Sequence, residues 1–383
     1  MNSSPILPGA NIGILGGGQL GRMLALAARR SGYQVQVMAT ERGSPAGQVA
    51  DRSYGTDLLA KIVQTFAKGV AVLTYEFENI PLEAAQAAAE VTHVRPSPEA
   101  LRITQNRSLE KHFLRQQGLP TVEFAAVATC EQAQAAIEQI GRPAVIKSTG
   151  LGYDGKGQVV IEPGDDIATA WSALNTADAV VEARVDLAME VSVVAARSLT
   201  GEFVHYGVIE NLHRQHVLDL SIAAAQLAPE LVDQALEIAR TVGEGLDLVG
   251  TYCVEMFLDS AGQLLVNEIA PRPHNSGHLT IEAAATSQFD QQLRAVCGLP
   301  LGSTQIFAPA AMVNLLGDVW AAGPPPWAEA FSDPAATLHL YGKRDARPGR
   351  KMGHITVAGG ADRNDVARRA LALRSRLAPH LDN

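Results

Sequence analysis

Short apolar runs that end in glycine or acidic residues make up the N-terminal third of the chain. Residues 11–15 form one such run, and residues 16–21, four of them glycine, lead into a segment with apolar residues at helical spacing. Further apolar runs over 33–38 and 70–79 have the length of strands. This alternation of strand, helix and strand predicts a Rossmann-like α/β domain, in which binding sites lie at the carboxyl ends of the strands.

Polar side chains follow the predicted strands of this domain. Residues 16–21 have the GxGxxG spacing, and glycine lets an anion approach the backbone N–H groups at a helix N-terminus. Glu41 stands roughly 20 residues further on, where an acid that binds the ribose of a dinucleotide would lie. Gln19, Glu76 and Asn79 would line the same crevice and could hydrogen-bond a polar ring or sugar. The pattern leaves open a dinucleotide site, a site for a smaller ligand and a solvated loop.

A second glycine-rich stretch joins two predicted strands, 144–147 and 158–161. Residues 150–157 contain four glycines, but they open no helix and lack the Gly-Lys-Ser/Thr ending of a Walker-type P-loop. A glycine hairpin of this kind can fold over a triphosphate. Its N–H groups and Lys147 would then neutralise charge while the loop excludes water. The stretch therefore predicts a lid above a nucleotide.

Two further strands are predicted over 179–185 and 190–196, followed by an amphipathic helix over 229–246. Exposed backbone at 182–185 could pair with an adenine edge. Glu190 could accept hydrogen bonds from ribose hydroxyls. Both features are also compatible with ordinary strand ends, so neither assigns a function alone.

Residues 251–270 predict a β-hairpin around the turn 259–262. The expected register places Leu258 opposite Gln263. It makes Glu255 and Glu268 diagonal neighbours on one face of the hairpin. Two carboxylates so placed suit Mg²⁺, which takes its other ligands from phosphate and water. The alternative is a slipped register with one glutamate facing solvent.

Two loops near the end of the chain carry basic side chains. Prolines hold the loop 270–278 extended while it presents Arg272, His274 and Asn275. A guanidinium and an imidazole beside a metal pair suit a small oxyanion. The segment 341–354 is dense in lysine and arginine, which on an acidic chain favours a phosphate monoester; a solvated run of charge is the alternative.

Length and composition exclude several classes of function. A chain of 383 residues is expected to form two or three domains, and its formal charge of −9 disfavours nucleic acid as a partner. No apolar run is long enough to span a bilayer, and the first ten residues do not resemble a secretory signal. Three scattered cysteines without a CxxC pair favour a reducing, cytoplasmic setting and argue against structural zinc.

Five motifs together resemble the ATP-grasp ligases, and among them the 5-(carboxyamino)imidazole ribonucleotide synthase family of purine biosynthesis. They are Gly-Gly-Gly-Gln-Leu-Gly at 16–21, Tyr-Glu-Phe-Glu-Asn at 75–79, Gly-Tyr-Asp-Gly-Lys-Gly-Gln at 152–158, Asn-Glu-Ile-Ala-Pro-Arg-Pro-His-Asn-Ser-Gly-His at 267–278 and Arg-Pro-Gly-Arg-Lys-Met-Gly-His at 347–354. The resemblance covers nearly the whole chain. It departs from the family pattern at Leu151, where a second glycine is common.

The resemblance implies an α/β and α+β molecule, with an ATP-grasp fold, an N-terminal Rossmann-like (pre-ATP-grasp) domain and a small C-terminal region. The expected boundaries are 1–118 for the N-terminal domain, 119–181 for the lid subdomain, and 182–383 for the catalytic core with the C-terminal region that binds the substrate phosphate. The expected partners are small molecules, with neither nucleic acid nor membrane, and family members are typically dimers.

The resemblance also implies a role for individual residues. ATP contacts are expected at Arg107, Lys147, Gly152, Tyr153, Asp154, Gly155, Lys156, Gly157, Gln158, Glu182, Ala183, Arg184, Val185, Glu190, His213, Asn267 and Glu268. Two Mg²⁺ ions are expected at Glu255 and Glu268. Bicarbonate and its activated form are expected at Tyr153, Lys156, Arg272 and His274, with Asp154 close by. Aminoimidazole ribonucleotide is expected at Gln19, Glu76, Asn79, Lys343 and Arg350, the last two at its 5′-phosphate.

The implied chemistry matches a site rich in Lys, Arg and Glu with no covalent nucleophile. ATP would phosphorylate bicarbonate to carboxyphosphate, a step catalysed mainly by positioning and charge neutralisation. The exocyclic amine of the imidazole would then attack carboxyphosphate or the carbon dioxide released from it, with water excluded. Asp154 or the released phosphate is the hypothesised proton acceptor.

Other functions predict different ligands. An NAD-dependent oxidoreductase would use residues 16–21 and Glu41, but it leaves the glycine lid and the glutamate pair unexplained. A formate-dependent transformylase or a biotin carboxylase would share the ATP-grasp fold and differ in substrate. A nucleotide sensor without catalytic activity is a further alternative.

Overall fold

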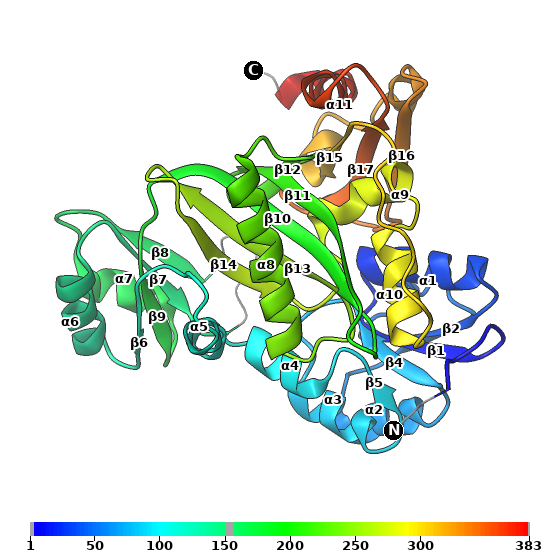
Figure 1. Cartoon of the computed structure of the whole chain (residues 1–383), viewed down its shortest axis with the longest axis horizontal. Helices are drawn as coiled ribbons and strands as arrows, with labels where there is room; N and C mark the ends of the chain where they lie inside the picture. The colour runs from blue at the N-terminus through cyan, green and yellow to red at the C-terminus, as the bar shows by residue number, and fades with distance from the viewer. Residues whose placement is uncertain (1–3, 151–156, 382–383) are drawn as a thin grey trace.

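The computed structural model describes residues 4–150 and 157–381, and it has three β-sheets with helices packed against them (Figure 1). The N-terminal domain, the lid subdomain and the C-terminal region lie around a central sheet. The predicted lid residues Gly152, Tyr153, Asp154, Gly155 and Lys156 lie outside the described residues, as does Leu151.

The N-terminal domain contains a five-stranded parallel sheet in the order β3-β2-β1-β4-β5. Its strands are β1 (Asn11–Leu15), β2 (Gln34–Ala39), β3 (Arg52–Gly55), β4 (Val72–Tyr75) and β5 (His93–Val94). The helices of this part are α1 (Gln19–Arg30), α2 (Ala60–Ala67), α3 (Leu82–Ala89), α4 (Pro98–Thr104) and α5 (Arg107–Gln116). The prediction of a Rossmann-like domain is confirmed. Because β1 and β4 are parallel neighbours, the glycine turn after β1 and Glu76 after β4 meet at one sheet edge.

The lid subdomain is a four-stranded sheet in the order β6-β9-β7-β8, with two helices on it. Its elements are β6 (Phe124–Val127), α6 (Cys130–Ile140), β7 (Ala144–Ser148), β8 (Gln158–Ile161), α7 (Ile167–Leu174) and β9 (Ala179–Ala183). β7 and β8 form the predicted antiparallel hairpin, with Lys147 opposite Gln158 at the end where the glycine-rich stretch joins the two strands. This subdomain lies on the left in Figure 1.

The central sheet has eight strands in the order β14-β13-β10-β11-β12-β15-β17-β16. The strands are β10 (Leu187–Arg197), β11 (Phe203–Arg214), β12 (Val217–Ala223), β13 (Gly250–Asp259), β14 (Leu264–Ala270), β15 (Ala310–Leu316), β16 (Ala336–Leu340) and β17 (Lys351–Ala358). The predicted amphipathic helix is α8 (Pro229–Gly245), whose buried face packs on β10, β11 and β13. The last three strands extend the same sheet into the C-terminal region, where α11 (Arg363–Leu377) packs on β15 and β17.

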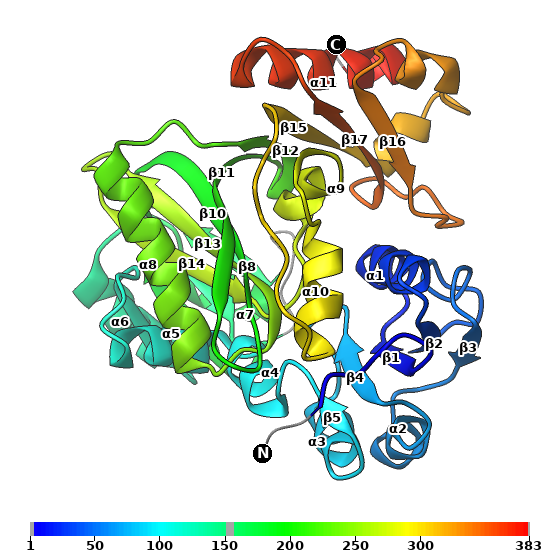
Figure 2. The ribbon, with the colours of Figure 1, turned by 45° about the vertical axis from the view of Figure 1, so that its right-hand side comes forward.

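Shorter helices connect the central sheet to its neighbours. They are η1 (Asn275–Leu279), α9 (Thr280–Ala283), α10 (Gln288–Val296), η2 (Gly317–Trp320), η3 (Trp327–Phe331) and η4 (Pro379–Leu381). Helix α10 lies between the central sheet and α1, and seven of its nine residues are buried because it packs on both (Figure 2). Within the described ranges, no helix is long and apolar enough to cross a membrane. The predicted domain boundaries at 118 and 181 stay predictions.

Candidate active site

The two glutamates of the β13–β14 hairpin face each other directly. The predicted register was wrong: Leu258 pairs with Leu264, and Glu255 pairs with Glu268. Met256 pairs with Val266, so Asn267 is an extra residue that forms a β-bulge. Directly opposed residues share a face of the hairpin. The prediction that both carboxylates lie on one face is therefore confirmed, although they are direct partners and not diagonal neighbours.

Glu255 forms an ion pair with His274 from the loop that follows β14. The His274 Nε2 and Glu255 Oε1 atoms are 2.9 Å apart, and both side chains are mostly buried. Burial raises the pKa of Glu255, but His274 outweighs this effect and lowers the pKa to about 2. Burial lowers the pKa of His274, whereas Cys253 and Glu255 raise it, and the net shift is upward.

Glu268 has the opposite shift. Its side chain is accessible to solvent, yet dense protein surrounds it, so desolvation and then repulsion by Glu255 raise its pKa. Among residues 4–150 and 157–381, no three His, Cys, Asp or Glu side chains gather to hold a metal ion. A pair of carboxylates that repel each other at an accessible position fits a cation whose other ligands come from phosphate and water.

A buried charge network connects this pair to the lid subdomain. The Lys147 Nζ atom is 2.7 Å from one carboxylate oxygen of Glu182, and Lys111 Nζ is 3.7 Å from the other. Burial raises the pKa of Glu182, but the two lysines outweigh it and lower the pKa. Arg107, at the start of α5, donates from Nη1 to the Ser148 carbonyl at 2.7 Å. The structure therefore gathers three predicted ATP contacts, Arg107, Lys147 and Glu182.

Two other predicted ATP contacts meet on the central sheet. Glu190 of β10 and His213 of β11 are 2.7 Å apart, and both are half-buried. Burial lowers the pKa of His213, but the hydrogen bond to Glu190 outweighs it and raises the pKa. Further along, Ala183 ends β9 and Gln158 begins β8. Gly157 accepts a hydrogen bond from Ser148 N at 2.8 Å, which closes the described part of the lid hairpin.

Arg272 joins the loop after β14 to the N-terminal domain. Its guanidinium lies 2.7 Å from Glu78, which follows β4, and both side chains are largely buried. The carboxylates of Glu78, Glu268 and Glu76 all raise the pKa of Arg272 and outweigh the effect of burial, which lowers it. The predicted oxyanion-binding loop thus faces the carboxyl edge of the parallel sheet. Asn275 is buried in η1.

The glycine turn after β1 binds a carboxylate of the chain itself. Gly18 N and Gly21 N donate to the two oxygens of Glu76, the second at 2.9 Å. A Cβ atom at Gly18 would lie 2.6 Å from the Glu76 carboxylate, so this close approach requires glycine. In this structure the N–H groups of Gly18 and Gly21 are therefore bonded to Glu76, which disfavours the dinucleotide alternative that the GxGxxG spacing left open. Gln19 begins α1 beside this contact.

The basic segment predicted to bind phosphate is the β16–β17 connection. Lys343 Nζ donates to the Lys351 carbonyl at 2.6 Å, and Arg350 Nη1 donates to the Asp345 carbonyl at 2.9 Å. The Gly342 carbonyl accepts from Gln48 Nε2 at 2.8 Å, which places this loop against the N-terminal domain. Lys343 also lies close enough to Glu76 to lower its pKa, although burial raises that pKa overall.

A chain of hydrogen bonds in the interior leads to the His274 ring. The sequence did not indicate it. Ser221 Oγ donates to Asn211 Oδ1 at 2.8 Å, and Asn211 Nδ2 donates to Ser192 Oγ at 2.8 Å. Ser192 Oγ donates to Ser276 Oγ at 2.9 Å, and Ser276 Oγ lies 3.0 Å from His274 Nδ1. These residues come from three strands and η1, so no sequence spacing could have connected them.

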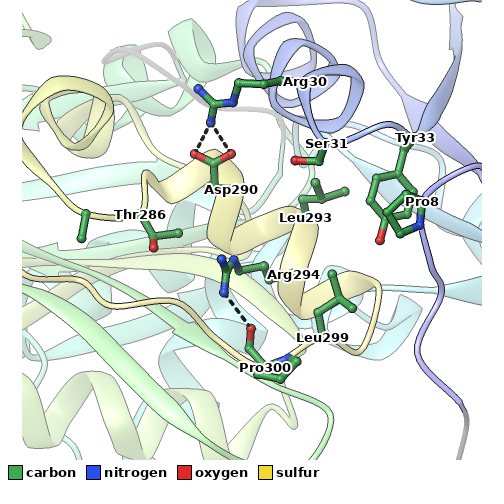
Figure 3. Close-up of a pocket in the computed structure, with 11 residues that line it drawn as sticks. Pro8, Arg30, Ser31, Tyr33, Thr286, Asp290, Leu293, Arg294, Leu299 and Pro300 are labelled. Atoms are coloured by element: carbon green, nitrogen blue, oxygen red, sulfur yellow. Dashed lines mark hydrogen bonds and ion pairs between the residues drawn. The ribbon is translucent and has the colours of Figure 1, made fainter.

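A surface pocket of about 530 Å³ lies away from these residues, between α1 and α10 (Figure 3). Arg30 binds both carboxylate oxygens of Asp290, at 2.6 and 2.7 Å, and Arg294 donates to the Pro300 carbonyl at 3.3 Å. The eleven lining residues include none of the predicted site residues. The pocket is therefore separate from the glutamate pair.

The central sheet with its opposed glutamates and the hairpin subdomain beside it define an ATP-grasp ligase. The family model of the ATP-grasp domain matches residues 112–289, that of the ribonucleotide synthetase preATP-grasp domain matches 10–105, and that of the phosphoribosylaminoimidazole carboxylase C-terminal domain matches 310–369. The chain belongs to the N5-carboxyaminoimidazole ribonucleotide synthase family.

Individual relatives resemble the chain over almost its full length. The Bacillus subtilis N5-carboxyaminoimidazole ribonucleotide synthase is 42% identical over 360 residues, which are 93% of each chain. A crystal structure of an ADP complex of N5-carboxyaminoimidazole ribonucleotide synthetase superposes with a TM-score of 0.92 at 39% identity, covering 100% of both chains. The Aspergillus clavatus synthase in complex with ADP and 5-aminoimidazole ribonucleotide has a TM-score of 0.88 at 33% identity, covering 96% of this chain and 99% of that one.

Proposed function

We propose that this protein carboxylates the exocyclic amine of 5-aminoimidazole ribonucleotide, using ATP and bicarbonate and releasing ADP and phosphate. The observation that carries the proposal is the direct opposition of Glu255 and Glu268 between two groups of basic residues. One group, with Lys147, belongs to the lid subdomain; the other, with Arg272, faces the N-terminal domain. A nucleotide and a second substrate can therefore approach the same carboxylates from two sides.

ATP would lie between the lid subdomain and the central sheet. Lys147 and Arg107 would neutralise its phosphates, while Glu190 and His213 would contact its ribose. Backbone groups of 182–185 would pair with the adenine. Support comes from the geometry. Lys147 binds Glu182, Arg107 binds the Ser148 carbonyl at the end of β7, and His213, paired with Glu190, lies close enough to Glu255 for that carboxylate to raise its pKa. Gly152, Tyr153, Asp154, Gly155 and Lys156 would complete the enclosure.

Two Mg²⁺ ions are proposed at Glu255 and Glu268, with Asn267 close by. The metal would supply charge neutralisation for the transferring phosphoryl group. The chain's own contribution is to hold two carboxylates on one face, at a position open to solvent on the Glu268 side.

Bicarbonate would bind near Arg272 and His274, with Tyr153 and Lys156 from the lid. Glu78 orients the Arg272 guanidinium, and the hydrogen-bond chain ending at Ser276 orients the His274 ring. Two cations fixed in this way favour negative charge that develops as carboxyphosphate forms. Asp154 or the released phosphate is proposed to accept the proton of the attacking amine.

Aminoimidazole ribonucleotide would bind at the carboxyl edge of the parallel sheet. Gln19, Glu76 and Asn79 would contact its base and ribose, and Lys343 with Arg350 would hold its 5′-phosphate. The β16–β17 connection lies against this edge through the bond from Gln48 to Gly342. The Aspergillus clavatus relative was crystallised with this ribonucleotide, which supports the substrate assignment.

An ADP-release assay tests the proposal. Release is expected to require bicarbonate and to rise strongly when aminoimidazole ribonucleotide is added. Carbon-13 from labelled bicarbonate should appear in the ribonucleotide product, as detected by NMR at alkaline pH. Dependence on formate in place of bicarbonate would reassign the substrate to that of a transformylase.

Replacing Glu268 by Gln is expected to lower kcat by about 100-fold or more, because an amide supplies no negative charge to the cation. The matched control is Glu230→Gln on the exposed first turn of α8, which should retain normal turnover. Equal kcat values for the two variants would contradict the assignment of Glu268.

A homodimer in the cytoplasm is proposed from the family resemblance. Light scattering during gel filtration of the purified protein tests the oligomeric state. A mass near twice the 40.5 kDa of the chain is expected.

A further inference from the structure

Two adjacent charged residues of α5, Glu110 and Lys111, are buried although the proposed function gives them no role. Their exposed fractions are 3% and 1%. Burial of a charged side chain is costly unless strong partners compensate for it. The partners identify what these residues do, because most of them are backbone groups of one short segment of β14.

Lys111 binds the backbone on the N-terminal side of Glu268. Its Nζ atom donates to the Asn267 carbonyl at 3.1 Å and contacts the Val266 carbonyl at 3.4 Å. Thr121 Oγ1 lies 3.1 Å from Lys111 Nζ and donates to the same Val266 carbonyl at 3.0 Å. The ammonium group therefore holds both carbonyls that precede Glu268.

Glu110 binds the backbone on the C-terminal side of Glu268. The Ile269 N–H group donates to Glu110 Oε1 at 2.7 Å, in a buried hydrogen bond between residues 159 positions apart. Consecutive residues of α5 thus hold the two peptide units that flank Glu268. Strand β14 is the edge of the central sheet, and segment 120–121 forms an isolated bridge with it at Val266, whereas the Asn267 carbonyl and the Ile269 N–H are bonded by the two side chains of α5.

The backbone held in this way is the β-bulge. Without the extra residue, Glu255 would pair with Asn267, and Glu268 would point to the opposite face of the hairpin. Along a regular strand, the residues whose backbone groups face outward are two positions apart. Val266 directs both its N–H and its carbonyl outward, and Ile269 directs its N–H outward three positions later, which shows the extra residue of the bulge. The bulge is therefore what brings the two carboxylates together.

We propose that Glu110 and Lys111 are positioning residues for Glu268, holding the bulge at Asn267 so that the two hairpin carboxylates can bind divalent cations with a nucleotide. Lys111 also contacts Glu182, the partner of Lys147, so the same ammonium group links the bulge to the nucleotide-binding lysine. The inference rests on the proposed function only through the assignment of Glu255 and Glu268 as cation ligands.

The test measures binding of Mn²⁺ and ADP to the full chain by electron paramagnetic resonance, without turnover. Lys111→Met and Glu110→Leu are expected to weaken Mn²⁺ binding about 10- to 100-fold, the usual effect of removing an outer support of a metal ligand. Glu110→Gln keeps an oxygen that can accept from Ile269 N–H and should recover most of the affinity. Gln116→Met, exposed on the same helix, is the matched control and should bind normally.

Hydrogen exchange of residues 264–270 is the second readout, and it should become faster in Lys111→Met and Glu110→Leu than in Gln116→Met. Folded variants that bind Mn²⁺ within twofold of the unchanged protein would overturn the proposal. If Lys111→Met does not fold, Thr121→Val tests the proposal in its place. This variant lacks the hydroxyl that donates to the Val266 carbonyl, and it should weaken Mn²⁺ binding. A further outcome is that the unchanged protein binds Mn²⁺ and ADP but fails to carboxylate the ribonucleotide. That result would refute the proposed function, but it would not contradict the positioning role of Glu110 and Lys111.

Discussion

Gly18 shows how a single residue sets the chemistry of the N-terminal domain. Its backbone N–H and that of Gly21 bind the carboxylate of Glu76, which is 7% exposed. The N-terminus of α1 carries a partial positive charge that would attract a ligand phosphate, but the Glu76 carboxylate of the same chain neutralises it. This contact argues against the dinucleotide alternative on physical grounds, because a pyrophosphate would have to displace a buried carboxylate.

Gly18→Ala is expected to lower the free energy of unfolding by about 1–3 kcal/mol, as for other overpacked sites. The added methyl would lie 2.6 Å from a carboxylate that its hydrogen bonds prevent from moving. Urea denaturation followed by circular dichroism measures the change. Gly69→Ala is the control, because its new Cβ would meet its nearest neighbour at 3.4 Å and should cost under about 0.5 kcal/mol. Equal losses would mean that Glu76 yields to the methyl group.

At the scale of elements, the C-terminal helix α11 is held by side-chain pairs at several points. Arg369 binds both oxygens of Asp333, at 2.6 and 2.7 Å, and Arg374 binds Asp219 of β12. The hydrogen bonds from Arg369 lower the pKa of Asp333 and outweigh the effect of burial. Because α11 covers the strands beside the β16–β17 connection, its attachment supports the proposed phosphate-binding loop.

Asp333→Asn should destabilise the protein by at most about 1 kcal/mol near neutral pH, since solvent screens the pair. A carboxyl whose pKa is lower in the folded state stabilises the fold above its unfolded pKa of about 3.8, and this contribution is lost as pH falls further. Thermal unfolding from pH 8 to 3 should show a constant difference between variant and unchanged protein down to about pH 4, then a shrinking one. A difference that grows on acidification would contradict this linkage.

At the scale of the whole molecule, the site depends on the central sheet and the parallel sheet meeting through α10 and the loop after β14. Gln292 of α10 accepts from Thr251 N–H at 2.5 Å and donates to Thr74 Oγ1 at 3.0 Å. One buried amide therefore joins the hairpin that carries Glu255 to the parallel sheet that carries Glu76. Figure 2 shows α10 between these parts.

Gln292→Leu is expected to lower the free energy of unfolding by about 1–3 kcal/mol, because the buried Thr251 N–H would lose its acceptor. Urea denaturation measures the loss. Gln134→Leu, exposed on α6, serves as the control and should change stability by less than about 0.5 kcal/mol. A similar effect in both variants would show that the bridge contributes nothing.

The sequence alone determined the local elements and the chemical types of the site. Apolar periodicity located the parallel strands, the glycine hairpin and α8, because these patterns depend on nearby residues. Motif resemblance identified the family, which the relatives confirm. Arg272, His274 and Glu255 were predicted as site residues, but the pairing of His274 with Glu255 and of Arg272 with Glu78 was not.

Only the tertiary structure decided which residues meet. The bulge at Asn267 brings Glu255 and Glu268 into direct pairing, and its backbone is hydrogen-bonded to α5, more than 150 residues earlier in the chain. The occupation of the glycine turn by Glu76 depends on β1 and β4 being neighbours. Such contacts join residues whose separation along the chain leaves no periodic signal, so packing energy and not local sequence pattern selects them.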